Sequence, residues 1–149
     1  MRISEATLKS LDDVAAWQSS NPRSEPITLL DYVGFVATPD TFFAFADLYS
    51  PSLVVHAGYR FVASRFSVDT YDAWVRTGTP LLDIQRVLNH VHISTLIQNI
   101  EVSDHVAVEA ARVLGELWQR TLGPHGLEVG VSGTTLDDAQ VTFWESQPP

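Results

Sequence analysis

The chain has 149 residues, the length of one ordinary domain, and its 45% hydrophobic and 18% charged residues are typical of a globular rather than a disordered protein. The 9 basic and 18 acidic residues give a net charge of −9, and such a charge repels phosphate backbones, which argues against general nucleic-acid binding. Cysteine is absent, which excludes disulfides and thiolate metal sites.

The N-terminus predicts neither a signal peptide nor a membrane anchor. The first 13 residues, MRISEATLKSLDD, contain no apolar stretch of the kind that a secretory signal requires. No apolar run approaches the roughly 18–20 residues needed to cross a bilayer. We therefore expect a cytoplasmic protein that is not embedded in a membrane.

The N-terminal part, residues 1–26, is expected to be a helix and a linker that precede the main body at 27–149, all within one globular domain. Residues 4–22 have a rough apolar stripe at helical spacing, and Asn21-Pro22 would end that helix. The next segment, 27–37, is ambiguous. Its β-branched and aromatic residues favour a strand, but its periodicity does not exclude a helix.

A helix is predicted from Thr38, as N-cap, to Tyr49, because Pro39 fits the first helical position and Pro51 lies just beyond the end. Residues 52–66 are predicted to be strands, with a hairpin turn near Ala57-Gly58. The positions expected on the buried side of this hairpin are Val55, Phe61, Ala63 and Phe66.

Two short helices are predicted next. The first covers 67–78, with Ser67 or Asp69 as its cap and Gly78 at its end. The second covers 79–90, and its apolar seam is expected to consist of Leu81, Ile84, Leu88 and Val91. The segment 92–101 is expected to be an extended connection.

The strongest helix signal lies between Ser103 and Pro124, where Ser103 is the cap and Gly123-Pro124 is the stop. Glu116 and Arg120 are spaced to form an i,i+4 ion pair. The apolar face is expected to consist of Val106, Ala110, Val113, Leu114, Leu117 and Thr121 or Leu122.

Two alternating runs near the C-terminus, at 127–133 and 139–145, predict a β-hairpin. Val129 and Val131 should share a face with Val141 and Phe143, while Trp144 should point the other way. Together these elements predict an α+β fold, with four or five helices on a mainly antiparallel sheet of four or five strands.

The stretch FFAFADLYSPSLVVHAGYRFVASRFSVDTYDAW, the run VLNHVHIS, a long helix and a final VTFWE strand resemble a family of small uncharacterised bacterial α+β proteins. The resemblance extends from Thr41 to Glu145, and its most specific element is the run Asn89-His90-Val91-His92. It implies the fold and a single domain, and it implies no activity. In this family the position of His56 is often acidic.

The residues Asn89, His90, His92 and His56 are the candidates for a binding site. Two histidines at i,i+2, together with a distant carboxylate such as Asp83 or Asp104, are compatible with a metal site. The alternative is structural: Asn89 and His90 cap the end of the preceding helix, and His92 hydrogen-bonds locally. We expect no bound metal and no cofactor.

The helix expected from Thr38 carries Phe42, Phe43, Phe45 and Tyr49, and these cannot all face one core because Phe42 and Phe43 point about 100° apart. Either the surroundings cover both sides, or an apolar patch is exposed and binds something.

Two classes of function therefore stay open, and the sequence does not decide whether the protein is an enzyme. The first is a small acidic protein that binds another protein or forms a homo-oligomer. The second is a small-ligand-binding protein or enzyme with a histidine-containing pocket around Asn89–His92. For this second class we expect a cone-shaped α+β domain, because FADLYSPSLVVHAGYRF is similar to the first helix and strand of the ketosteroid-isomerase-like superfamily.

Overall fold

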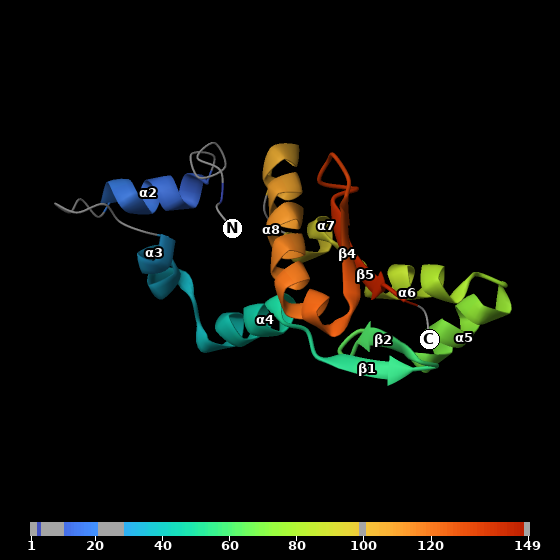
Figure 1. The fold of residues 1–149 in the computed structure, drawn as a ribbon. Coiled ribbons are helices and arrows are strands. Elements are labelled where there is room, and N and C mark those ends of the chain that lie inside the picture. The colour runs from blue at the N-terminus through green and yellow to red at the C-terminus, as the bar shows by residue number, and fades with distance from the viewer. Residues whose placement is uncertain (1–2, 4–10, 21–28, 99–100, 148–149) are drawn as a thin grey trace.

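The fold is that of a computed structural model, which describes residues 3, 11–20, 29–98 and 101–147 (Figure 1). Within these residues lie seven α-helices, one short 3-10 helix and five strands, which confirms the predicted α+β class. The elements in chain order are α2 (Asp12–Ser20), α3 (Leu29–Val36), α4 (Pro39–Tyr49), β1 (Leu53–His56), β2 (Tyr59–Val62), α5 (Val68–Arg76), α6 (Leu81–Asn89), β3 (Val91–His92), α7 (Ile93–Leu96), α8 (Asp104–Leu122), η1 (Gly123–His125), β4 (Leu127–Ser132) and β5 (Gln140–Glu145).

The five described strands form two small antiparallel sheets. Strands β1 and β2 form the predicted hairpin, and Ala57 and Gly58 make its turn with φ values of 50° and 84°. Positive φ at both central residues is the geometry of a tight hairpin turn. The other sheet has the order β3-β5-β4. The described strands are therefore divided between two sheets, and the expectation of one sheet of four or five strands is wrong.

The C-terminal hairpin has the predicted register. Val129 pairs with Phe143, and Val131 pairs with Val141. Trp144 lies on the opposite face, where the guanidinium carbon of Arg86 stands 4.4 Å from the centre of its ring. The alternation of side chains between the faces of a strand sets this arrangement.

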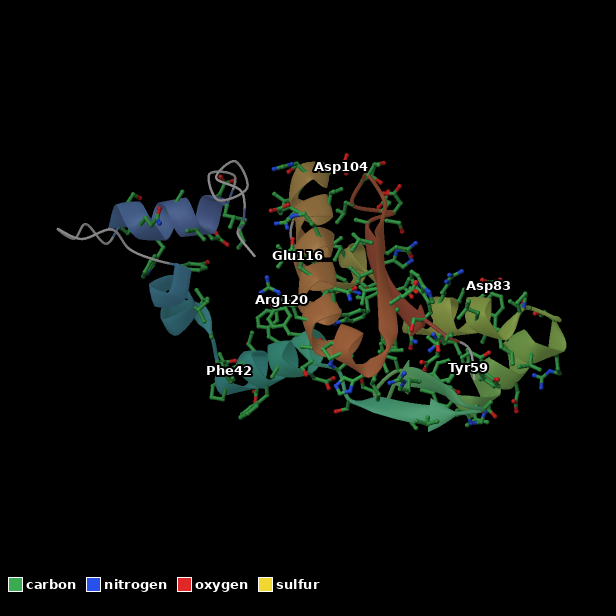
Figure 2. All side chains as sticks on the ribbon, viewed as in Figure 1. Phe42, Tyr59, Asp83, Asp104, Glu116 and Arg120 are labelled. Atoms are coloured by element: carbon green, nitrogen blue, oxygen red, sulfur yellow. The ribbon has the colours of Figure 1, made fainter. Side chains whose placement is uncertain are left out.

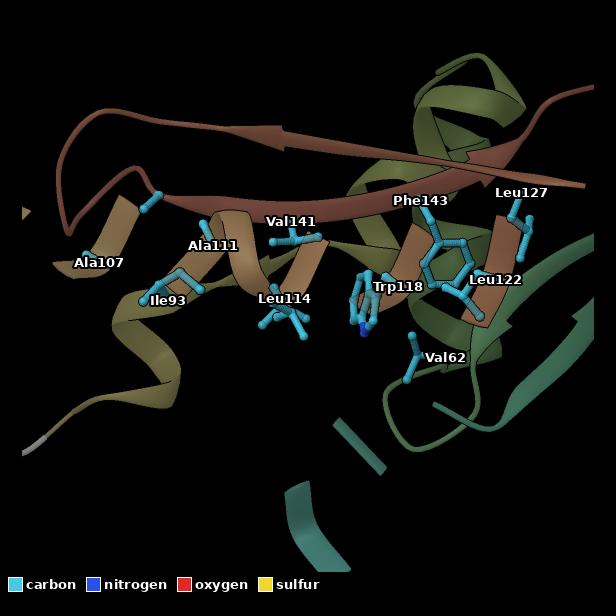
Figure 3. Close-up of a cluster of buried hydrophobic side chains, with 12 residues drawn as sticks. Val62, Ile93, Ala107, Ala111, Leu114, Trp118, Leu122, Leu127, Val141 and Phe143 are labelled. Carbon is cyan, nitrogen blue, oxygen red and sulfur yellow. The ribbon is translucent and has the colours of Figure 1, made fainter. Parts of the chain in front are cut away.

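Helix α8 covers one face of the three-stranded sheet and, with it, encloses the main core (Figure 3). Trp118 and Phe143 meet edge to face at 5.5 Å between ring centres, and both are almost completely buried. The twelve buried members of this core are Val62, Val91, Ile93, Ala107, Ala111, Leu114, Trp118, Leu122, Leu127, Ala139, Val141 and Phe143.

Leu114 and Leu122 of α8 are buried as predicted, but the centre of the buried face is displaced from the predicted one by about one residue, or 100° of rotation. The buried residues of the helix are Ala107, Ala111, Leu114, Gly115, Trp118 and Leu122. Small residues allow the helix to approach the sheet closely, and a Cβ atom on Gly115 would collide with Val131 of β4. A second difference from the prediction is that Glu116 forms its ion pair with Arg112 and not with Arg120.

Helices α5 and α6 begin and end close to the predicted residues. The Ser67 hydroxyl accepts a hydrogen bond from the Thr70 amide and caps α5, and Gly78 follows that helix with a φ of 75°. Ile84 of α6 is buried with Tyr59, Phe61 and Tyr71 in a second, smaller cluster. In the predicted seam of α6, Leu81 is instead exposed, and Val91 belongs to β3.

Other expectations need correction. The segment 92–101 is not simply extended, because α7 begins at Ile93, whose amide donates to the carbonyl of Ala139. In the first hairpin Phe61 is buried as predicted, but Val55 and Ala63 are exposed. The register explains Val55: Val54 is the residue that pairs with Phe61 and packs with it, whereas Val55 pairs with Arg60 on the opposite face of the hairpin.

The ambiguous segment 27–37 is helical over α3. As a helix, the segment satisfies its backbone groups locally, for example by the hydrogen bond from the Ala37 amide to the Val33 carbonyl at 2.9 Å. Trp17 of α2 and Tyr32 of α3 meet edge to face at 5.5 Å. The predicted N-terminal helix is described only as α2, and its residues 4–10 and 21–22 lie outside the described residues.

None of the described helices is both long enough and apolar enough to cross a membrane.

Candidate interaction surface

Asn89, the first predicted site residue, is a completely buried bridge between the two sheets. Its Oδ1 accepts from the Val62 amide at 3.1 Å, and its Nδ2 donates to the carbonyls of Arg60 and Phe143 at 3.0 and 3.4 Å. The amide side chain thus supplies β2 and β5 with the hydrogen bonds that a neighbouring strand would otherwise make. Its role is structural, but it does not cap α6 as we expected.

Gln85, one turn earlier on α6, extends the same bridge. Its Nε2 donates to the carbonyl of Arg60 at 3.0 Å, and its Oε1 accepts from the amide of Glu145 at 2.9 Å. Because residues four apart lie on one face of a helix, α6 presents both amides to the gap between the sheets. Buried polar groups need such partners, so the two amides fix the position of the sheets relative to each other.

An ion pair completes the bridge. The Arg60 Nε and Nη2 atoms donate to the carboxylate of Glu145 at 2.9 and 2.5 Å, and the Arg60 amide donates to the same carboxylate at 3.2 Å. The hydrogen bonds from Arg60 lower the pKa of Glu145 from its ordinary value, although partial burial opposes this shift. The same pairing raises the pKa of Arg60. The pair is therefore ionised at neutral pH and holds the end of β5 to β2.

His90 lies at the end of α6, where its Nδ1 forms a hydrogen bond with the carbonyl of Val87. This confirms the predicted capping role, because the last carbonyls of a helix have no partner within the helix. The His92 ring stands 4.8 Å from the His90 ring, but its Nδ1 is buried without a hydrogen-bond partner. The expected local hydrogen bond of that atom is therefore not made.

The fourth predicted residue, His56, lies elsewhere. Its ring packs 4.7 Å from the ring of Tyr71 and 5.2 Å from that of Phe66, between the first hairpin and α5. The structure brings His90 and His92 together but does not join them with His56. Within the part of the chain that the structure describes, no three histidine or carboxylate side chains converge as a metal site would require.

A small hollow of about 300 Å³, lined by both polar and apolar residues, lies beside the histidine run. Val91, Thr95 and Trp118 contribute to its wall, and Asp47 and Arg65 are its charged residues. Arg65 is partly engaged, since its Nη1 donates to the carbonyl of His90 at 2.7 Å. None of the four predicted residues lines this hollow.

The most distinctive surface of the molecule is on α4. This helix is well formed: Pro39 occupies its first turn, and the Thr38 hydroxyl accepts from the Thr41 amide at 3.2 Å. Nevertheless none of its residues is buried. Its exposed aromatic residues are Phe42, Phe43, Phe45 and Tyr49, which are 62%, 69%, 46% and 40% exposed and are called here the aromatic face. Phe42, Phe45 and Tyr49 share one side of the helix, and Phe43 adjoins that side because its ring meets the ring of Phe42 edge to face at 5.9 Å, although the two residues point about 100° apart.

Helix α4 is attached to the body mainly at its C-terminal end. The Trp118 Nε1 donates to the carbonyl of Leu48 at 2.8 Å. The Thr121 hydroxyl lies 3.4 Å from the carbonyl of Tyr49, but its nearest acceptor is the Leu117 carbonyl of its own helix at 3.1 Å. Leu48 is the half-buried residue that packs against the core. Phe42 lies on the part of α4 that is distant from α8 (Figure 2).

An apolar groove of about 470 Å³ adjoins the aromatic face, between α4, α7 and α8. Gln98 is the one polar residue in its lining, which consists of Phe45, Leu48, Tyr49, Ile93, Leu96, Ile97, Gln98, Ala110, Val113 and Leu114. Phe45 and Tyr49 belong to both features, and their rings stack 5.7 Å apart. The aromatic face and the apolar groove therefore form one continuous surface.

The groove explains the misplaced face of α8. The predicted stripe of Val106, Ala110, Val113 and Leu117 is real, but it lies on the half-buried side of the helix. Ala110 and Val113 face the groove, whereas the small residues beside them face the sheet. Helix α8 is thus apolar on two faces, and only one of them is covered by the core.

Sequence reasoning missed this groove, because its walls bring α4 together with α7 and α8, which come much later in the chain. The sequence offered one indication of an exposed apolar surface: Phe42 and Phe43 are adjacent on a helix and cannot both face one core. No protein-family model matches the chain, and no curated protein or solved structure is significantly similar to it.

Proposed function

We propose that this protein is a protein-interaction module and that the aromatic face of α4, with the adjoining apolar groove, is its binding surface. The observation that carries the proposal is that α4 has no buried residue while it exposes four aromatic side chains. A helix held in place at one end gains little from such residues in water. They become useful when another polypeptide covers them.

The exposed area supports this proposal. From their exposed fractions, the four aromatic residues leave roughly 400 Å² in contact with water. At about 25 cal/mol per Å², covering that area corresponds to a gross gain of about 10 kcal/mol, against which the cost of association must be set. Contiguous apolar patches of this size on monomeric proteins often mark interaction sites.

The chemistry of the surface favours a protein over the other classes of ligand. Aromatic residues are enriched in protein interfaces, whereas the net charge of −9 opposes binding to phosphate backbones. The alternative of a histidine-containing pocket has less support, because Asn89 is committed to the bridge between the sheets and His56 lies apart from His90 and His92.

A photo-crosslinking amino acid at position 42, introduced in the host cell, tests the proposal. The matched control is the same amino acid at Val55, which is 67% exposed on β1, outside the proposed surface. We expect position 42 to crosslink to a polypeptide, either this chain or another, and position 55 not to do so. The proposal is wrong if positions 42, 43 and 45 all give no crosslinked polypeptide.

A further inference from the structure

We infer that the partner is a second copy of this chain, and that α4 of each copy packs antiparallel against α4 of the other around a two-fold axis. This inference rests on the proposed function, because it names what covers the same surface. It follows from the shape, the area and the charge of that surface.

The positions of the exposed rings and of the groove suit an antiparallel pairing. Phe42 and Phe43 are exposed on the N-terminal half of α4, while Phe45 and Tyr49 of its C-terminal half line the groove. A projection and a hollow that are neighbours on one helix face each other when two copies pack antiparallel. A two-fold axis near Phe45 then places Phe42 of each copy in the groove of the other, which is the closed arrangement most common among homo-oligomers.

The area is sufficient without any further surface. The four aromatic residues and Leu96, which is 44% exposed, present roughly 500 Å² per copy, or about 1,000 Å² for the pair. Specific interfaces begin at about this size. Val33 and Val36 of α3, 45% and 47% exposed, add to the apolar area that precedes α4 in the chain.

The charges allow this arrangement and give it a measurable property. The described lining of the groove has no residue that is charged at neutral pH, so pairing the copies desolvates no charge there. Each copy nevertheless has a net charge of −9, so the two copies repel each other. Salt screens this repulsion and should strengthen the dimer, whereas salt would weaken a complex with a basic partner.

Sedimentation equilibrium of the purified full chain over a range of concentrations tests the inference. Phe43→Glu is compared with Val55→Glu, since the two positions are 69% and 67% exposed and receive the same charge. We expect a dimer for the wild type and for Val55→Glu. Phe43→Glu should raise Kd at least about 100-fold, because a tenfold loss occurs twice in a two-fold interface.

Salt and engineered disulfides provide two further readouts. Raising the salt from about 50 to 500 mM should lower the Kd of the wild-type dimer. The chain has no cysteine, so Phe42→Cys and Val113→Cys can be mixed as single variants and oxidised. A disulfide between positions 42 and 113 is expected, whereas Val55→Cys should form none with Val113→Cys.

A wild-type chain that is monomeric at all concentrations overturns the inference. So does a dimer that Phe43→Glu leaves intact, one that Val55→Glu disrupts equally, or one that salt dissociates. The crosslinking experiment separates this failure from that of the proposed function. A monomer that crosslinks from position 42 to a different protein contradicts the two-fold dimer alone, and a monomer that crosslinks to nothing contradicts both.

Discussion

Helices α4 and α8 have similar N-terminal caps, but α8 is packed in the core whereas α4 lies exposed to water. A hydroxyl side chain caps each of them: Thr38 accepts from the Thr41 amide, and Ser103 accepts from the Val106 amide. Both are rich in apolar residues, yet α8 buries six residues and α4 buries none. Local signals therefore produce both helices, and only the position of the sheet decides which apolar side chains leave water. The comparison also separates the part of the molecule that holds the fold from the part that is available to a partner.

The largest difference in unfolding free energy is expected between Phe143→Ala and Phe43→Ala. Phe143 is fully buried under α8, so its truncation leaves a cavity beside Trp118 and should cost about 3–5 kcal/mol of unfolding free energy. Phe43 is 69% exposed, and in the monomer its truncation should change stability by less than about 0.5 kcal/mol. Urea unfolding at low protein concentration measures both. Equal losses would show that α4 is part of the core.

Asn89→Ala tests whether the polar bridge, as well as the apolar core, holds the body together. The change removes the donor to the buried Phe143 carbonyl and the acceptor of the Val62 amide, and it leaves the Arg60 carbonyl with Gln85 as its donor, so we expect a loss of about 2–4 kcal/mol in urea unfolding. His90→Ala is the neighbouring control, and it removes only a cap, with an expected loss of about 0.5–1 kcal/mol. A loss of the same size for both variants would contradict the role of Asn89 as the bridge.

Glu145→Gln should weaken the body in a pH-dependent way. The folded-state pKa of Glu145 lies below its ordinary value of 4.5, so the ion pair with Arg60 contributes fully above that pH and is lost as the pH falls through the folded-state pKa. At pH 7 the variant should be about 1–2 kcal/mol less stable than the wild type.

The stability difference between Glu145→Gln and the wild type should shrink as the pH falls below about 4.5 and through the lowered folded-state pKa of Glu145, because the wild type then loses its carboxylate charge as well. Unfolding curves across this range measure it. The comparison with the variant isolates this pair from Asp138, whose pKa is also lowered, by hydrogen bonds from Thr135 and Thr134. A difference that is independent of pH would contradict the ion-pair explanation.

Removal of the two helix caps should give the smallest difference in unfolding free energy, but it tests most directly whether α4 is less tightly coupled to the core than α8. Ser103→Ala should cost about 1 kcal/mol of global stability, because α8 is part of the core. Thr38→Ala removes an equivalent cap from α4, so we expect faster hydrogen exchange in its first turn with little change in global unfolding. A global loss of the same size for Thr38→Ala would show that α4 unfolds together with the body.

Much of the candidate site lay beyond sequence reasoning for a specific reason. The pattern at Asn89-His90-Val91-His92 stood out because polar side chains crowd a helix end, and His90 does form the predicted cap. Asn89 acts across the fold, on Val62 and Phe143, which lie 27 and 54 residues away in the chain. Such partners are determined by the packing of the two sheets and leave no local pattern.

Local physical chemistry determined most of the elements. Caps and stops placed α4, α5 and α8, the period-2 alternation gave β4 and β5 their register, and Ala57-Gly58 gave the first hairpin its turn. These features depend on neighbours within a few residues, which the sequence displays. Tertiary structure decided which side of α8 meets the sheet, because small residues such as Gly115 permit a close approach that larger neighbours prevent. Tertiary structure also left α4 exposed, because burial depends on which surfaces meet in space. The local sequence pattern of α4 predicts a helix equally well whether its aromatic residues contact a partner or water.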